Sequence, residues 1–139
     1  MGTAIYSQSI FTLVRMGLAD QVSRVREGLS SNCVVEMSDA LAMSCATLLD
    51  TLQLSTSSVC TRIKKKKPLT LEEGSAVLRL AKALDKAEAV FENRVQACLW
   101  LKRKTRSFRG VTPVSLMDTS SGYELVMRQL GRIEHGVVA

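Results

Sequence analysis

A chain of 139 residues, of which 46% are hydrophobic and only 4% aromatic, is too apolar to be intrinsically disordered and too poor in rings to favour a sandwich of short strands. The length suits one domain, or two small ones that share a core. The net charge of +6 is compatible with a nucleic-acid partner, but charge alone does not establish one.

Metal, cofactor and membrane roles are not expected. The cysteines (Cys33, Cys45, Cys60 and Cys98) lack the C-x-x-C pairing of zinc sites, and the single histidine, His135, lies far along the chain. Cys33, Cys45 and Cys98 have apolar neighbours, so we expect buried, reduced thiols. There is neither a basic leader followed by a sustained apolar stretch nor an apolar run of about 20 residues, which predicts a cytoplasmic protein without membrane contact.

Hydrophobic spacing predicts an all-α fold, because no segment has a competing strand period. In residues 1–30 we expect an N-terminal helical extension of one or two short helices, punctuated by Gly17 and Gly28. Three short helices are then expected in residues 31–67, which end at Pro68.

Residues 68–139 are predicted to form a second helical domain with clearer boundaries. Thr70-x-x-Glu73 is a capping box ahead of a long apolar stripe, and Asn93 is positioned to cap the helix after it. That next helix has four candidates for core-facing positions: Val95, Cys98, Leu99 and Leu101.

The end of the chain has its own helix signals. Thr112-Pro113 predicts the start of a short helix, because proline fits the first turn. Ser121-x-x-Glu124 predicts a second capping box, and the last helix is expected to end near Gly136.

Residues 44–64 have the apolar spacing of a helix-turn-helix, with a first helix that starts at Ser44 and a second that Ser55 caps. Two positions depart from the usual pattern: Gln53 occupies a turn position that favours glycine, and Leu49 one that favours a small residue. An ordinary helical hairpin packed in the core is the alternative. In a helix-turn-helix, DNA phosphates and base edges would be contacted by Thr56, Ser57, Ser58, Thr61, Arg62, Lys64, Lys65, Lys66 and Lys67.

Two basic segments each admit two interpretations. Residues 62–67, with Arg62 and four lysines, are either a solvated helix end, where cations suit the helix dipole, or a phosphate-binding flank of the recognition helix, which we favour. Residues 102–110 form a second basic loop with Phe108 among its cations. For this loop we favour a solvated segment whose ring packs in the core over a grip on nucleic acid.

Glu134 and His135 stand side by side, which is a pairing that acid–base catalysis uses. No nucleophile motif and no glycine-rich phosphate loop accompanies them. We therefore predict no catalytic residues and a protein that is not an enzyme.

Four motifs follow one another in the second half of the chain. They are Leu69-Thr70-Leu71-Glu72-Glu73, then Ala97-Cys98-Leu99-Trp100-Leu101, then Thr112-Pro113-Val114-Ser115-Leu116-Met117-Asp118-Thr119, and finally Gly122, Val126 and Leu130 with Arg132-Ile133-Glu134-His135-Gly136-Val137. In their order and spacing they resemble the Xre-type antitoxins of RES–Xre toxin–antitoxin modules, a group with ParS and MbcA relatives. The resemblance covers slightly more than half of the chain.

The resemblance implies an all-helical antitoxin of a type II toxin–antitoxin system, with an N-terminal helix-turn-helix domain that binds operator DNA and represses its own operon. Its C-terminal domain would bind a RES-domain toxin, an enzyme that degrades NAD, and its extreme C-terminus would block the toxin's active-site cleft. In this chain, the toxin-contact residues that the resemblance implies are Arg132, Glu134, His135, Gly136, Val137, Val138 and Ala139.

The family also implies a homodimer within a larger toxin–antitoxin complex. Met and Leu side chains between residues 34 and 54 are expected to be exposed and to supply its apolar interface. The alternative function is a stand-alone helical transcription regulator with no toxin partner.

Overall fold

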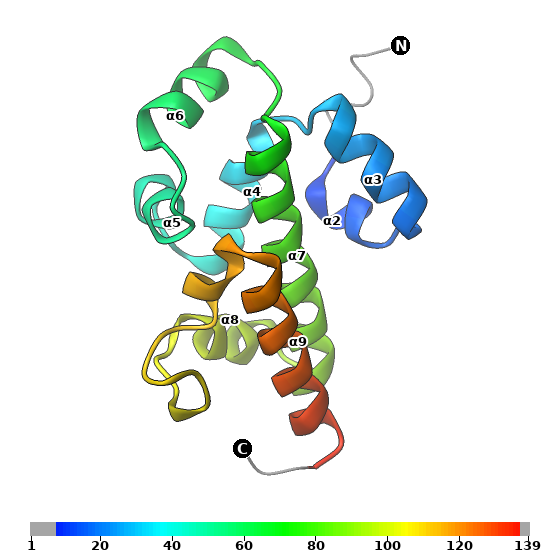
Figure 1. Ribbon diagram of the computed structural model, residues 1–139, viewed down its shortest axis with the longest axis vertical. Coiled ribbons are helices and arrows are strands. Elements are labelled where there is room, and N and C mark those ends of the chain that lie inside the picture. The colour runs from blue at the N-terminus through cyan, green and yellow to red at the C-terminus, as the bar shows by residue number, and fades with distance from the viewer. Residues whose placement is uncertain (1–7, 137–139) are drawn as a thin grey trace.

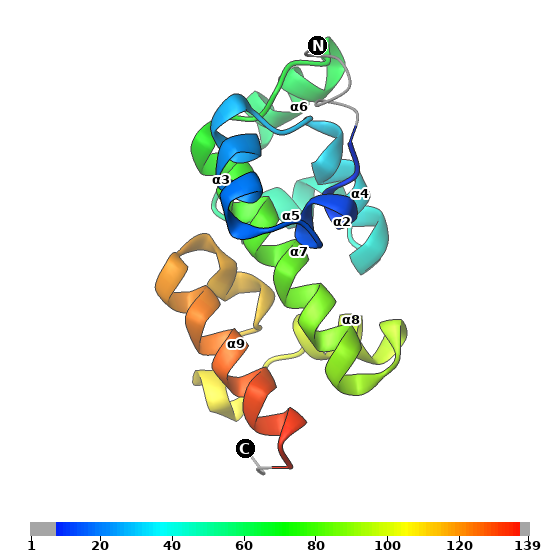
Figure 2. The same ribbon diagram turned by 90° about the vertical axis from the view of Figure 1, so that its right-hand side faces the viewer.

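The computed structural model describes residues 8–136, and within them the fold is all-helical, as predicted. Its helices are α2 (Ile10–Val14), α3 (Leu18–Glu27), α4 (Asn32–Leu41), α5 (Cys45–Thr51), α6 (Thr56–Lys65), α7 (Leu71–Phe91), α8 (Arg94–Lys102) and α9 (Ser120–Glu134), with two short 3-10 helices, η1 (Arg106–Phe108) and η2 (Val114–Asp118). Helix α7 is the long central element (Figures 1 and 2). Helices α3 to α6 lie toward its first half, α8 and α9 lie toward its second half, and α2 and η2 lie beside its middle.

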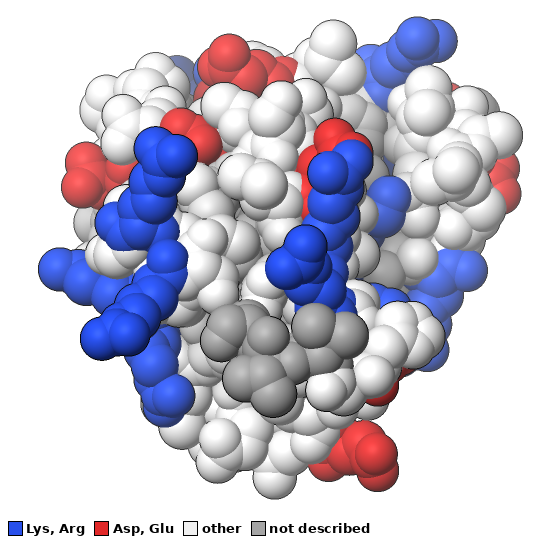
Figure 3. All heavy atoms as spheres, turned by 60° about the horizontal axis from the view of Figure 1, so that its bottom comes forward, with Lys and Arg blue, Asp and Glu red and all other residues white. Residues whose placement is uncertain are grey.

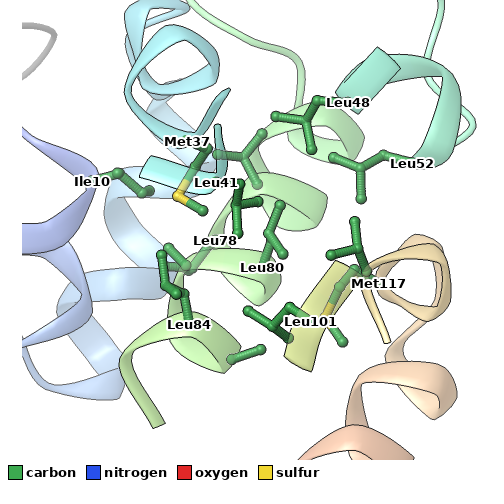
Figure 4. Packing of buried hydrophobic residues seen from close by; sticks show 14 of the residues in the cluster. Ile10, Met37, Leu41, Leu48, Leu52, Leu78, Leu80, Leu84, Leu101 and Met117 are labelled. Carbon is green, nitrogen blue, oxygen red and sulfur yellow. The ribbon is translucent and has the colours of Figure 1, made fainter. Parts of the chain in front are cut away.

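The core lies along α7, because its apolar side chains recur on several faces of the helix. Leu80, Ala83 and Leu84 are fully buried. Figure 4 shows side chains of α2, α4 and α5 converging on those of α7, α8 and η2. A single hydrophobic cluster therefore joins the helix-turn-helix region to the C-terminal helices. None of the helices in residues 8–136 combines the length and the apolar character that crossing a membrane requires.

Most of the predicted caps are confirmed. The Thr70 hydroxyl accepts from the Glu73 amide at 3.2 Å, and the Glu73 carboxylate accepts from the Thr70 amide at 2.9 Å, which completes the capping box of α7. Side chains of Ser55 and Asn93 cap α6 and α8 as expected, and Ser44, which was expected to start a helix, caps α5. Gly17 and Gly28 flank α3, so residues 8–30 contain two helices, α2 and α3.

The second predicted capping box is wrong. Helix α9 begins at Ser120, and its cap is the Thr119 hydroxyl, which accepts from the Gly122 amide at 3.0 Å. The reason is a tertiary contact: Gly122 packs so closely on η2 that a Cβ atom there would lie 2.0 Å from the Leu116 carbonyl oxygen. This contact fixes Gly122 inside the first turn of α9. The helix start at Thr112-Pro113 is confirmed, although it is a 3-10 helix.

The expected apolar interface between residues 34 and 54 is also wrong. Met37, Leu41, Leu48, Leu49 and Leu52 are all buried, because they face α7 rather than solvent. Exposed apolar side chains occur elsewhere, on α3, α7, α8 and α9 and at Val111.

The cysteines are free thiols, and burial is confirmed for Cys33 and Cys98, whereas Cys45 is half-buried. Burial, reinforced by the neighbouring Glu36 carboxylate, raises the pKa of Cys33 to about 12. Burial also raises the pKa of Cys98, whose thiol donates to the Ala40 carbonyl oxygen at 3.1 Å. Both are therefore structural thiols of low reactivity.

Candidate functional site

Helices α5 and α6 form a helix-turn-helix in which a non-glycine residue occupies the turn. Gln53 has a φ of 60°, the left-handed conformation that explains why glycine is usual at this position. Its side-chain amide donates to the Asp50 carbonyl oxygen at 3.3 Å, and the Leu54 amide donates to the Leu49 carbonyl oxygen at 2.9 Å. Leu49, in α5, is fully buried in the core. The fold therefore accommodates both residues that depart from the usual helix-turn-helix pattern, Gln53 in the turn and Leu49 in the core.

The outward face of α6 carries hydroxyl groups and cations. A hollow of about 330 Å³ is lined by Ser57, Ser58, Thr61, Arg62, Lys65 and Lys67, all of them predicted DNA-contact residues. The remaining predicted residues, Thr56, Lys64 and Lys66, lie on the same helix or at its cap. In residues 8–136, the lysines at 64–67 make no ion pair, so their charges are available to a phosphate backbone.

Arg62 differs from these lysines because a carboxylate holds it. Its guanidinium donates to both carboxylate oxygens of Glu73, at 2.9 and 3.2 Å. Glu73 is buried, and it also closes the capping box of α7. Arg62 therefore ties α6 to the start of α7, a link that no local sequence motif predicts.

The ionised state of Glu73 is favoured despite its burial. Burial by itself raises the pKa of a carboxyl group, but the hydrogen bonds from Arg62 and Thr70, with the charge of Arg62, outweigh it, and the pKa of Glu73 lies below the ordinary 4.5. The pair consequently stays charged near neutral pH.

The last turn of α9 carries the predicted toxin contacts. Arg132, Glu134, His135 and Gly136 are exposed there, and Gly136 leaves the helix with a φ of 78°. The Glu134 carboxylate accepts from Lys86 at 2.8 Å, which fastens this turn to α7 and lowers the pKa of Glu134. Val137, Val138 and Ala139 lie outside the described residues.

The basic loop after α8 exposes its cations to solvent and buries the Phe108 ring, which is the interpretation that the sequence favoured. Phe108 is buried and packs edge-on against Trp100, with ring centroids 6.3 Å apart. Arg103, Lys104 and Arg106 are exposed. Figure 3 views the end of the molecule away from α6 and shows basic side chains gathered over it.

Two of the predicted core positions on α8 are wrong. Cys98 and Leu101 are buried, but Val95 is 65% exposed and Leu99 is 42% exposed. Positions i and i+4 on a helix share a face, so these two form an apolar strip turned to solvent. Periodicity identified the apolar residues of this helix but not which of its faces the rest of the chain covers.

Comparison with known proteins finds two matched parts of the chain. Residues 20–82 match the model of the antitoxin Xre-like helix-turn-helix domain, and residues 86–136 match that of the antitoxin Xre/MbcA/ParS C-terminal toxin-binding domain. A helix-turn-helix followed by a toxin-binding domain defines the antitoxin of a toxin–antitoxin pair, and not an enzyme.

Similar full-length proteins agree with this class. An antitoxin Xre from Photorhabdus laumondii is 31% identical over 116 residues, which are 83% of this chain and 78% of that protein. A second antitoxin Xre, from Pseudomonas putida, is 27% identical over 82% of this chain and 70% of its own length. A protein named Prs ADP-ribosylating antitoxin, from a Sphingobium species, is 26% identical over 91% of this chain and 86% of its own. The chain belongs to the Xre antitoxin family.

Proposed function

We propose that this antitoxin neutralises a RES-type, NAD-degrading toxin by binding it and blocking its active site with the C-terminal tail. The observation that carries the proposal is the match of residues 86–136 to a toxin-binding domain. The RES type is supported by the family resemblance of the ordered motifs in the second half of the chain. The name of the Sphingobium relative agrees, because ADP-ribosylation draws its ADP-ribose from NAD.

The tail is proposed as the blocking element because of how α9 ends. Helix α9 is anchored by its buried Val126 and Leu130, and the exposed Lys86–Glu134 ion pair adds a contact with α7 at its last turn. Gly136 then releases the chain from the helix, and two valines follow. A short apolar segment on a rigid base fills a cleft with little loss of conformational entropy in the base.

Deleting residues 135–139 is expected to abolish neutralisation while leaving the fold intact, since α9 ends at Glu134. The measurement is growth of cells that co-express the toxin with either form of the antitoxin. A matched control keeps the length and replaces residues 135–139 by glycine and serine, and it should fail as the deletion does. If the truncated antitoxin protects cells from the toxin as fully as the wild type does, the tail proposal is contradicted.

We also propose that α6 binds operator DNA and that the antitoxin represses its own operon. The support is the helix-turn-helix match over residues 20–82, with the hydroxyl-lined hollow and the unpaired lysines of the α6 face. A stand-alone regulator would need the same face but no toxin-binding domain, so the match of residues 86–136 argues against it.

A homodimer is part of the proposal, and its support comes from a groove between α3 and α7. The groove measures about 290 Å³, and its rim includes Leu18 and Leu71, which are 71% and 60% exposed. We expect light scattering to give the mass of two chains for the wild type. Replacing Leu18 and Val22 by Asp should give one chain, with unchanged helix content because both side chains are exposed. A wild-type chain that stays monomeric at high concentration would contradict it.

A further inference from the structure

The exposed strip of α8 and the loop that follows it form one continuous surface, which we name the α8–loop surface. It consists of Val95, Leu99, Lys102, Arg103, Lys104, Arg106 and Arg109. Val95, Leu99 and Lys102 occupy positions i, i+4 and i+7, so they follow one face of α8 and lead into the loop. An apolar strip thus ends in a basic cluster.

The charge of this surface is not balanced within the protein. From residue 94 to residue 117 the chain has six cations and no Asp or Glu. Arg94 pairs with Glu88 at 3.2 Å, but the five cations of the α8–loop surface make no ion pair with any residue from 8 to 136. Unpaired cations gathered on one surface are complementary to an acidic partner.

The loop that presents these cations is held in place. Phe108 anchors its middle in the core, and Trp100 packs on Phe108 from α8. The Gly110 amide donates to the Thr105 carbonyl oxygen at 2.8 Å, and the Thr105 amide donates to the Val111 carbonyl oxygen at 3.2 Å. These two hydrogen bonds close the loop at its base. The loop backbone that carries these cations is therefore ordered before a partner binds, which lowers the entropic cost of binding.

Position and composition favour a protein partner over DNA. The recognition helix α6 lies at one end of the molecule, and α8 and the loop lie toward the other (Figures 1 and 2), so the α8–loop surface is separate from the α6 face. Exposed Val95 and Leu99 beside arginines match the apolar centre and Arg-rich composition of protein interfaces. DNA-binding surfaces are more polar and are dominated by phosphate contacts.

We infer that the α8–loop surface docks an acidic patch of the toxin, as a second contact besides the C-terminal tail. This inference rests on the proposed function, since the whole surface falls within the toxin-binding match of residues 86–136. In this arrangement the surface captures and orients the toxin by charge, and the tail then blocks its active site. Rim charges of this kind act mainly on the rate of association.

The test uses two full-length variants with the same loss of charge. The loop variant is R103A/K104A/R106A and the α6 variant is K64A/K65A/K67A; all six side chains are exposed, so both variants should fold as the wild type does. The probes are the purified product of the adjacent reading frame and a duplex of the operon's promoter. Association rates with each probe are measured from low to high salt, and circular dichroism checks the fold.

We expect the loop variant to associate with the toxin about tenfold more slowly at low salt and with a flatter salt dependence, while its binding to DNA is unchanged. The α6 variant should do the reverse. Toxin association equal to the wild type in the loop variant would overturn the inference and leave the tail proposal intact. Loss of DNA binding in the loop variant would assign the surface to nucleic acid instead. A wild-type chain that binds no toxin would overturn the proposed function itself, and the inference with it.

Discussion

Gly122→Ala is expected to lower the free energy of unfolding by about 3 kcal/mol or more. The added Cβ would lie 2.0 Å from the Leu116 carbonyl oxygen and 2.9 Å from its carbonyl carbon. Both are backbone atoms, so no side-chain rotation relieves the overlap, and α9 must separate from η2. Urea unfolding followed by circular dichroism measures the loss. An unfolding free energy within about 0.5 kcal/mol of the wild type would contradict the packing described at this contact.

Gly131→Ala is the matched control, because it lies in the same helix and makes the same change. No atom lies within 4 Å of a Cβ built there. Alanine in an open helix position is favoured over glycine by about 0.5–1 kcal/mol, so this variant should be slightly more stable than the wild type. Opposite signs for the two substitutions would tie the effect of Gly122→Ala to the η2 contact rather than to helix propensity.

Glu73→Ala is expected to destabilise the protein by about 3 kcal/mol, since it removes half of a capping box and leaves Arg62 without its partner. This loss lies at the lower end of what breaking a buried ion pair costs, because the Arg62 side chain is 30% exposed. Glu73→Gln keeps an acceptor for the Thr70 amide and should lose about half as much. Glu72→Ala, at the exposed neighbouring position, is the control and should change little.

The same pair gives a defined pH dependence. Because the pKa of Glu73 is lower in the folded state than the ordinary 4.5, the stabilisation is fully present above about 4.5 and is lost as the pH falls through the folded-state pKa. The difference in stability between the wild type and Glu73→Ala should therefore shrink on acidification. A difference that is constant from neutral to acidic pH would show that the charge of Glu73 does not contribute.

Local signals predicted the helices well. Caps such as Ser44, Ser55 and Thr70 act within one turn, so the residues that determine them are adjacent in the sequence. The failed prediction at Ser121 has a different origin, since the start of α9 is set by the approach of Gly122 to η2. That contact depends on how two elements meet, which local chemistry does not specify.

The candidate site was predictable in position but not in detail. Turn spacing located the helix-turn-helix, and hydroxyls with lysines marked its outer face. The ion pair between Arg62 and Glu73 joins residues on two helices, and the sequence does not indicate that these two residues will pair. Exposure was the weakest prediction: Met37 and Leu41 are buried by α7, whereas Val95 and Leu99 are uncovered. Periodicity defines an apolar face, and only the packed fold decides what covers it.

The most direct measurement is the rate of NAD consumption by the purified product of the adjacent reading frame, while the full-length antitoxin is titrated into it. We expect the partner alone to consume NAD, and the rate to fall to background once the antitoxin reaches a fixed molar ratio. A partner that consumes no NAD, or NAD consumption that continues unchanged in an excess of folded antitoxin, would contradict neutralisation of a RES-type toxin.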